Sequence, residues 1–399
     1  MKRYFNDLKK ILAFALIKVA PGLFNVALIP FLVARLRPDA YGNYSLWLSY
    51  AMLVATVIGA VVTQPMYRYL SSRPEDRALF DSFMLVAAVA AGAISTAVAV
   101  GLNAPGWLPL GYAAFSAGTV LSAGVSVGFQ IDRRIGRLAL YEGLRVLTIV
   151  LPIAAPILMG QALETGHVVL GLALSNFVPL ALLSGPLRLV APPGQWLRKA
   201  TLYGVKSAAW LLLAGIPVVG SKSILSSALT PDSFGAYSAF ADITYRGFGL
   251  VNAAVTMWVF PVLSRRFDEG ALEEVRHLLR FALSIYALSG AAVLAGALAL
   301  ALAKPDLTAH LSGGLAAIAL ITLANFAWQG MSIAHKPFEL TVRTTRMVLL
   351  LAVGVGAFLM LPKAIGMAAA VDPLFAVTAA MAGVAIVYIA ISMNQDLGR

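Results

Sequence analysis

The chain has 399 residues, of which 60% are hydrophobic and only 12% are charged. Soluble domains carry about 25% charged residues, so this chain has too few charges to cover a water-exposed surface. It has no cysteine, which excludes disulfides and Cys-ligated metals, and its net charge is +12. The basic residues lie in short gaps between apolar runs, which is typical of membrane orientation rather than of nucleic-acid binding. We therefore predict a membrane protein with no metal, cofactor or nucleic-acid partner.

Apolar runs long enough to cross about 30 Å of hydrocarbon recur along the whole chain. The first follows a basic start and exceeds the apolar region of a signal peptide, so we interpret it as a retained helix. No outer loop is long enough to form a catalytic domain, and the charged stretch 262–280 is expected to be a short cytoplasmic surface helix. The sequence thus predicts an all-α polytopic protein with about 12 transmembrane helices. In chain order they are 11–34, 44–63, 79–102, 107–129, 138–160, 165–187, 201–229, 236–261, 279–303, 311–334, 344–362 and 373–393.

The basic residues also predict the orientation of these spans. With the N-terminus in the cytoplasm, 21 of the 30 Lys and Arg residues fall on the cytoplasmic side, 4 on the outer side and 5 inside spans. Short cytoplasmic loops of membrane proteins carry such an excess of positive charge. We expect a multi-pass protein of the bacterial cytoplasmic (inner) membrane with both termini in the cytoplasm.

An internal repeat divides the spans into two sets of six. PDAYGNYS (38–45) aligns with PDSFGAYS (231–238), and five of the eight positions are identical. Two further proline pairs, Pro21 with Pro217 and Pro65 with Pro261, are 196 residues apart. We interpret the motif as a tight outer-surface turn, although any short helical hairpin favours Pro, Asp and Gly. The repeat predicts two parallel lobes, residues 1–190 and 200–399, joined by a cytoplasmic linker at 188–200.

The first hairpin resembles a known family. FLVARLRPDAYGNYS (31–45) is similar to the opening of Wzx-type polysaccharide and O-antigen flippases of the MOP (multidrug/oligosaccharidyl-lipid/polysaccharide) superfamily. AIGMAAA (364–370) is similar to their entry into the last helix. The chain departs from that pattern at Arg37, where Gly is common, at Asp39-Ala40, where the family has an acidic pair, and in having twelve spans where many relatives have fourteen.

The resemblance implies a V-shaped, MATE-like bundle around a polar cavity. It implies a flippase that moves an undecaprenyl-diphosphate-linked oligosaccharide from the cytoplasmic to the outer leaflet by alternating access. Such transport breaks no bond, needs no cofactor and serves the synthesis of O-antigen, lipopolysaccharide or exopolysaccharide, with membrane lipids and a polymerase or glycosyltransferases as partners. The departures leave a multidrug or toxin exporter, or a lipid II flippase, of the same superfamily open.

Basic residues inside the spans are the candidate contacts for a diphosphate, because charges within a membrane are costly and usually functional. Arg246 lies near the middle of its span and is the strongest candidate, since a guanidinium fits phosphate oxygens. An ion pair with Asp242, four residues earlier, is the alternative. Lys18 and Lys222 either face the cavity or extend toward a membrane surface. Arg145 lies near the inner end of its span, where an interfacial ion pair is the plainer interpretation.

Two acids lie within the spans, Asp242 and Glu142. Each is either a coupling carboxylate or the partner of a nearby cation, Arg246 or Arg145. Five basic residues against two acids disfavour a cationic drug as substrate.

Polar and aromatic side chains within the spans could hydrogen-bond or stack on sugars, although interhelical packing explains each equally well. Helix breaks beside prolines could act as hinges. The candidate sugar contacts are Gln64, Asn252, Asn325, Trp328 and Gln329, and the candidate hinges are Pro21, Gly22 and Pro217.

Overall fold

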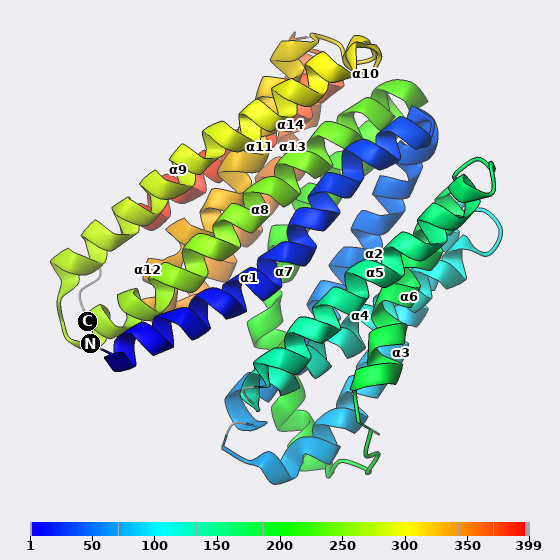
Figure 1. Cartoon of the computed structure of the whole chain (residues 1–399). Coiled ribbons are helices and arrows are strands. Elements are labelled where there is room, and N and C mark those ends of the chain that lie inside the picture. The colour runs from blue at the N-terminus through cyan, green and yellow to red at the C-terminus, as the bar shows by residue number, and fades with distance from the viewer. Residues whose placement is uncertain are drawn as a thin grey trace. The chain divides into compact units, whose positions relative to one another are not determined.

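The computed structural model describes residues 2–395 except 71, 133, 186, 342 and 370, and the side chains of these residues except 2–16, 18, 19, 258, 261 and 366–369. All the regular structure in the described part of the chain is helical (Figure 1). The elements are α1 (Lys2–Arg35), α2 (Pro38–Pro65), a π-helical turn (Met66–Leu70), a 3-10 turn (Pro74–Asp76), α3 (Arg77–Gly101), α4 (Leu108–Ile131), α5 (Ile135–Leu158), α6 (Thr165–Leu183), α7 (Gly194–Ala228), α8 (Pro231–Asp268), α9 (Leu272–Ala303), α10 (Pro305–Ala309), α11 (Leu315–Ala334), α12 (Lys336–Leu340), α13 (Thr344–Ala369) and α14 (Pro373–Met393).

The all-helical, multi-span architecture predicted from the sequence is confirmed. Each predicted span coincides with one long helix, and α10 and α12 are short additional helices. Within the described residues, ten helices are long and apolar enough to cross a membrane, and α8 is an eleventh if its two arms, bent by 41°, form one span. The described apolar part of α1 is Ala20–Arg35, which is shorter than a full span.

The prediction of a separate surface helix at 262–280 is wrong. Residues up to Asp268 continue α8, Gly270 turns the chain with a φ of 75°, and α9 begins at Leu272. The charges of this stretch pair with one another: Arg265 and Arg266 both bond the carboxylate of Glu269. These two hydrogen bonds hold the pKa of Glu269 below its usual value. The apolar runs of the sequence show only which part of each helix can lie in lipid. Local ion pairs stabilise the charged end of α8 and the charged start of α9 beyond the apolar runs.

The chain divides into two compact units. Unit 1 comprises Met1–Pro21 and Leu46–Gly215, and unit 2 comprises Gly22–Ser45 and Ile216–Arg399. The unit boundaries therefore fall within α1, α2 and α7. The lobes and linker drawn from the repeat, 1–190, 188–200 and 200–399, stay a prediction.

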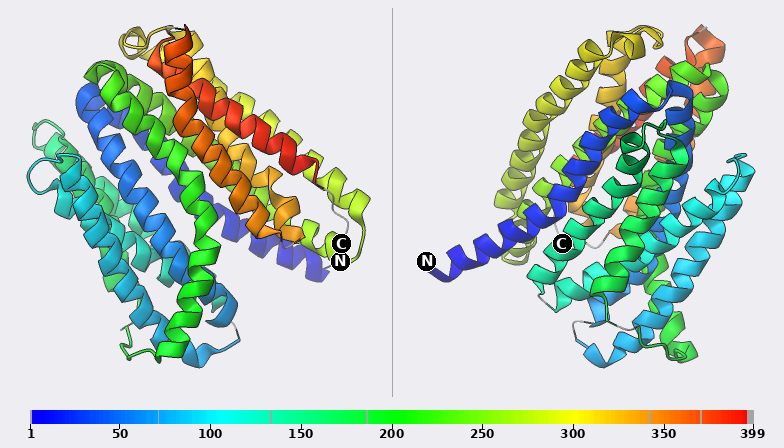
Figure 2. Two further views of the ribbon diagram at one scale, coloured as in Figure 1. Left: turned by 180° about the vertical axis from the view of Figure 1, so that it is seen from behind. Right: turned by 45° about the vertical axis from the view of Figure 1, so that its right-hand side comes forward.

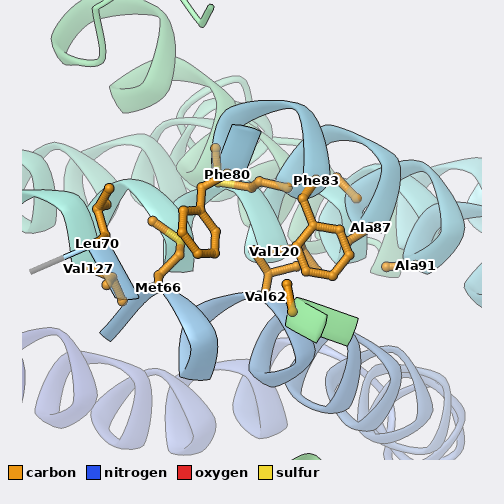
Figure 3. Packing of buried hydrophobic residues seen from close by; sticks show 12 residues of the cluster. Val62, Met66, Leu70, Phe80, Phe83, Ala87, Ala91, Val120 and Val127 are labelled. Atoms are coloured by element: carbon orange, nitrogen blue, oxygen red, sulfur yellow. The ribbon is translucent and has the colours of Figure 1, made fainter. Parts of the chain in front are cut away.

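In unit 1, α3 packs along α4, while α6 packs against both α4 and α5 (Figure 2). One core cluster joins the π-helical turn that follows α2 to α3, with Met66 and Leu70 against Phe80 and Phe83 (Figure 3). The first turn of α7 is fixed to the same region, because the indole of Trp196 packs edge-on against Phe80 and donates a hydrogen bond to Asp76.

In unit 2, α8 packs against α9 and α11, and α14 packs against α11 and α13. The first hairpin of the chain belongs to this unit, and the two repeat motifs explain why. The two motifs, predicted to be tight outer-surface turns, form the opening turns of α2 and α8, with Pro38 and Pro231 as first helical residues. A Cβ atom on Gly235 would lie 2.0 Å from the carbonyl oxygen of Pro38, and one on Gly42 would lie 3.1 Å from the backbone of Gly235. The shared glycine of the motif thus lets the two helix starts touch.

Candidate functional site

A buried ion pair joins α7 and α8 within unit 2. The ammonium of Lys222 lies 2.6 Å from Oδ1 of Asp242, and the two side chains are only 3% and 7% exposed. The other carboxylate oxygen, Oδ2, accepts hydrogen bonds from the hydroxyls of Ser45 (2.6 Å) and Tyr41 (3.0 Å), both on α2. The Lys222 ammonium also donates to Ser45 Oγ at 2.7 Å. Three helices therefore meet at one carboxylate, which satisfies the demand that a buried charge be paired and hydrogen-bonded.

The repeat motif supplies two of these groups. Tyr41 and Ser45 belong to the 38–45 motif, and the glycine contact between the starts of α2 and α8 brings them beside Asp242. The equivalent of Ser45 in the second motif, Ser238, is buried without a hydrogen-bond partner among the described residues. The network is therefore not repeated at the second motif.

Arg246 lies one helical turn beyond Asp242 on α8 and is partly exposed, in contrast to the buried pair. Among the residues that the structure describes, none forms a hydrogen bond or ion pair with its guanidinium. Asp242 attracts this guanidinium, and the Lys222 ammonium repels it. Because Lys222 balances the single negative charge of Asp242, the cluster keeps one net positive charge at Arg246.

The partner of Asp242 in the structure is therefore not the residue that the sequence suggested. Spacing alone favours Arg246 at i+4, whereas the structure pairs Asp242 with Lys222 from another helix. For Lys222, the interpretation of a lysine extending toward the membrane surface does not fit its burial in this pair.

A second ion pair lies in unit 1, on a single helix. Arg145 and Glu142 of α5 lie 3.0 Å apart, with the arginine side chain 29% and the glutamate 4% exposed. Arg145 also donates to the side-chain oxygen of Asn176 on α6, which in turn accepts from Ser122 of α4. Ser122 shares a hydrogen bond with the hydroxyl of Tyr141. The pair is neutral overall, and its hydrogen bonds tie α4, α5 and α6 together.

The predicted sugar contacts are spread over both units. Asn325 and Trp328 on α11 are buried, and the Asn325 amide donates to Thr244 and to the Ala241 carbonyl on α8. Gln329 reaches the carbonyl of Tyr245 on α8 at 3.5 Å. Asn325 and Gln329 therefore link α11 to α8. Asn252 accepts from Thr256 on its own helix and is partly exposed, as is Gln64 in unit 1.

The predicted hinges lie at unit boundaries. Pro21 and Gly22 are the residues on either side of the boundary in α1, and Pro217 follows the boundary in α7 by two residues. Both helices are continuous there. Gly22 also allows close packing, because a Cβ atom would lie 2.2 Å from a methyl group of Leu250. The side chain of Lys18 lies outside the described residues. Hinge motion stays a prediction.

Among the described residues, no group of three or more His, Asp or Glu side chains could hold a metal ion. The chemistry that the described clusters offer is that of fixed charges and hydrogen-bond donors. Arg246 is the group among them that can pair with an anion without first breaking an ion pair.

Comparison with known proteins gives the fold. No family model and no curated protein matches the sequence. An inward-facing multidrug resistance MATE family transporter of the MOP superfamily matches 95% of this chain and 97% of its own, with a TM-score of 0.62 at 14% identity. An outward-facing one matches 97% and 93%, with a TM-score of 0.58 at 14% identity. A MOP superfamily transporter from Pyrococcus furiosus, whose binding pocket of reversed polarity suggests a different function, matches 96% and 94% with a TM-score of 0.58, also at 14% identity. The chain therefore has the MATE-like fold of MOP superfamily transporters.

Proposed function

We propose that this protein is a flippase that moves an undecaprenyl-diphosphate-linked oligosaccharide from the cytoplasmic to the outer leaflet of the bacterial inner membrane by alternating access. The fold is one seen in both inward-facing and outward-facing transporters. A fold hosts many substrates, so the choice among them rests on the charged side chains.

The observation that carries the proposal is that no described residue pairs with the guanidinium of Arg246. This guanidinium lies within the membrane-spanning part of α8. An unpaired cation in a membrane interior is costly unless it meets an anion or water. A guanidinium offers a flat set of donors that matches phosphate oxygens.

A diphosphate is also suited to outward movement. An inside-negative potential favours the export of an anion by about 2.3 kcal/mol per charge per 100 mV. Such transport needs no coupling carboxylate, which agrees with the engagement of both Asp242 and Glu142 in ion pairs.

Arg145 of unit 1 and Lys18 of α1 are proposed as further cations that the substrate meets. Asn252, Gln64 and Gln329 are proposed as sugar contacts, since all three are partly exposed. The proposed hinges are Pro21, Gly22 and Pro217. A polymerase or glycosyltransferases are the proposed partners in the membrane, and both termini are proposed to be cytoplasmic.

A multidrug exporter is the second candidate, because the fold matches transporters of that kind. A free carboxylate favours a cationic drug, however, and the ion pairs already hold Asp242 and Glu142. The reversed pocket polarity of the Pyrococcus furiosus transporter suggests that this fold accommodates pockets of either sign.

Translocation in proteoliposomes tests the proposal. A fluorescent undecaprenyl-diphosphate oligosaccharide is placed in one leaflet and its appearance in the other is followed, while a fluorescent organic cation is tested in parallel. We expect protein-dependent movement of the lipid-linked sugar alone. Movement of the cation alone would reassign the protein as a drug exporter. In a second assay with lipid II as the substrate, movement of lipid II but not of the other lipid-linked sugar would narrow the protein to a lipid II flippase.

A further inference from the structure

The pairing of Asp242 is a choice between two cations. Arg246 follows it by four residues on α8, a spacing that places the two side chains on one face, within reach of each other. Lys222 approaches from α7 and holds Oδ1 at 2.6 Å. With one carboxylate and two cations, whichever cation binds Asp242 leaves the other with its charge uncompensated.

Two hydroxyls of α2 stabilise the pairing of Asp242 with Lys222. Ser45 bonds both Oδ2 of Asp242 and the ammonium of Lys222, at 2.6 and 2.7 Å, so it links the two partners directly. Tyr41 donates to the same Oδ2 at 3.0 Å. Both carboxylate oxygens are therefore already engaged, and the buried geometry makes this arrangement hard to exchange.

We propose that Lys222 is a specificity-determining residue that acts through Asp242: by holding this carboxylate it keeps Arg246 available to an anionic ligand. Lys222 need not touch the ligand to do so. This inference rests on the proposed anion contact of Arg246, and it revises the role of Lys222 from a substrate cation to a positioning residue.

Removal of the Lys222 charge should then weaken anion binding even though Arg246 is intact. In Lys222→Met, the carboxylate of Asp242 loses its partner and pairs with Arg246, which competes with the ligand. In the double variant Lys222→Met/Asp242→Asn, no carboxylate remains to compete, and binding should return. A lysine that contacts the ligand directly would not be rescued in this way.

The test uses the full chain in detergent micelles, with farnesyl diphosphate as the probe and farnesol as its uncharged control, measured by calorimetry. Arg276→Gln, which alters an exposed pair with Glu273 on α9, is the control variant. We expect Arg246→Gln and Lys222→Met each to weaken diphosphate binding by about tenfold or more, the size of a lost charge-assisted hydrogen bond. The double variant should bind within about threefold of the native protein, and farnesol binding should not change.

The variants separate the two proposals. Unchanged diphosphate binding by Arg246→Gln would overturn the anion contact itself. A loss in Arg246→Gln with native binding in Lys222→Met, or a folded double variant that is not rescued, would overturn the role of Lys222 alone. If Lys222→Met does not fold, Asp242→Asn replaces it: our account expects binding at least as tight as in the native protein, and a tenfold loss would contradict it.

Discussion

Each unit holds a buried carboxylate paired with a cation, and the two pairs are built differently. In unit 1, Glu142 and Arg145 are three residues apart on α5, and the arginine keeps 29% of its side chain exposed. In unit 2, Asp242 of α8 takes its partner Lys222 from α7, and the lysine is 3% exposed. The pair of unit 1 forms within one helix, and its link to a neighbouring helix is the hydrogen bond from Arg145 to the amide oxygen of Asn176. A pair between helices fixes those helices together, and here it leaves the local cation, Arg246, without its expected partner.

The largest expected effect comes from breaking the pair of unit 2. Asp242→Ala leaves the Lys222 ammonium buried and uncompensated, which should lower the free energy of unfolding by about 3–5 kcal/mol. Unfolding of the purified protein in mixed micelles measures this. The double variant Lys222→Met/Asp242→Leu removes both charges and should cost far less. A double variant as unstable as Asp242→Ala would show that the uncompensated charge of Lys222 is not the cause of the lost stability.

The second-largest loss of stability is expected at the glycine contact between the starts of α2 and α8. Gly235→Ala places a methyl group 2.0 Å from the Pro38 carbonyl oxygen, so the starts of α2 and α8 must move apart. We expect a loss of about 1–3 kcal/mol, the range for overpacking. Gly383→Ala on α14 is the matched control, because nothing lies within 4 Å of its added Cβ. Equal thermal stability of the two variants would argue against close contact between the repeat motifs.

Loss of the ion pair of unit 1 should destabilise the protein less than loss of the ion pair of unit 2. In Glu142→Gln, Arg145 keeps its hydrogen bond to Asn176 and part of its contact with the surroundings, so we expect a cost of about 1–2 kcal/mol. The same unfolding measurement checks it. A loss as large as that of Asp242→Ala would remove the distinction between the two pairs.

The smallest effect is expected at the exposed pair of α9. Arg276 bonds Glu273 at 2.7 Å, but both side chains are largely exposed. Exposed pairs contribute about 0–1 kcal/mol. The free energy of unfolding of Arg276→Gln should therefore lie within about 0.5 kcal/mol of that of the native protein. A larger loss would contradict the view that this exposed pair adds little stability.

The helices were predictable from the sequence because about 20 consecutive apolar residues have few alternatives in lipid. The motif glycines at positions 42 and 235 were also visible, although not that they meet each other. The partner of Asp242 was not predictable: the i+4 rule favours Arg246, while Lys222 is twenty residues away in sequence, on another helix. Its only signal was the small polar patch Gly220–Ser223 within an apolar span. Tertiary contact also explains why Asn325 and Trp328, read as possible sugar contacts, are buried between helices.

An experimental structure with a bound prenyl diphosphate would test the central claim most directly. We expect diphosphate oxygens within hydrogen-bond distance of the Arg246 guanidinium, while Lys222 stays paired with Asp242 and Ser45. A diphosphate bound away from Arg246, or an Arg246 paired with Asp242 in place of the ligand, would contradict the account.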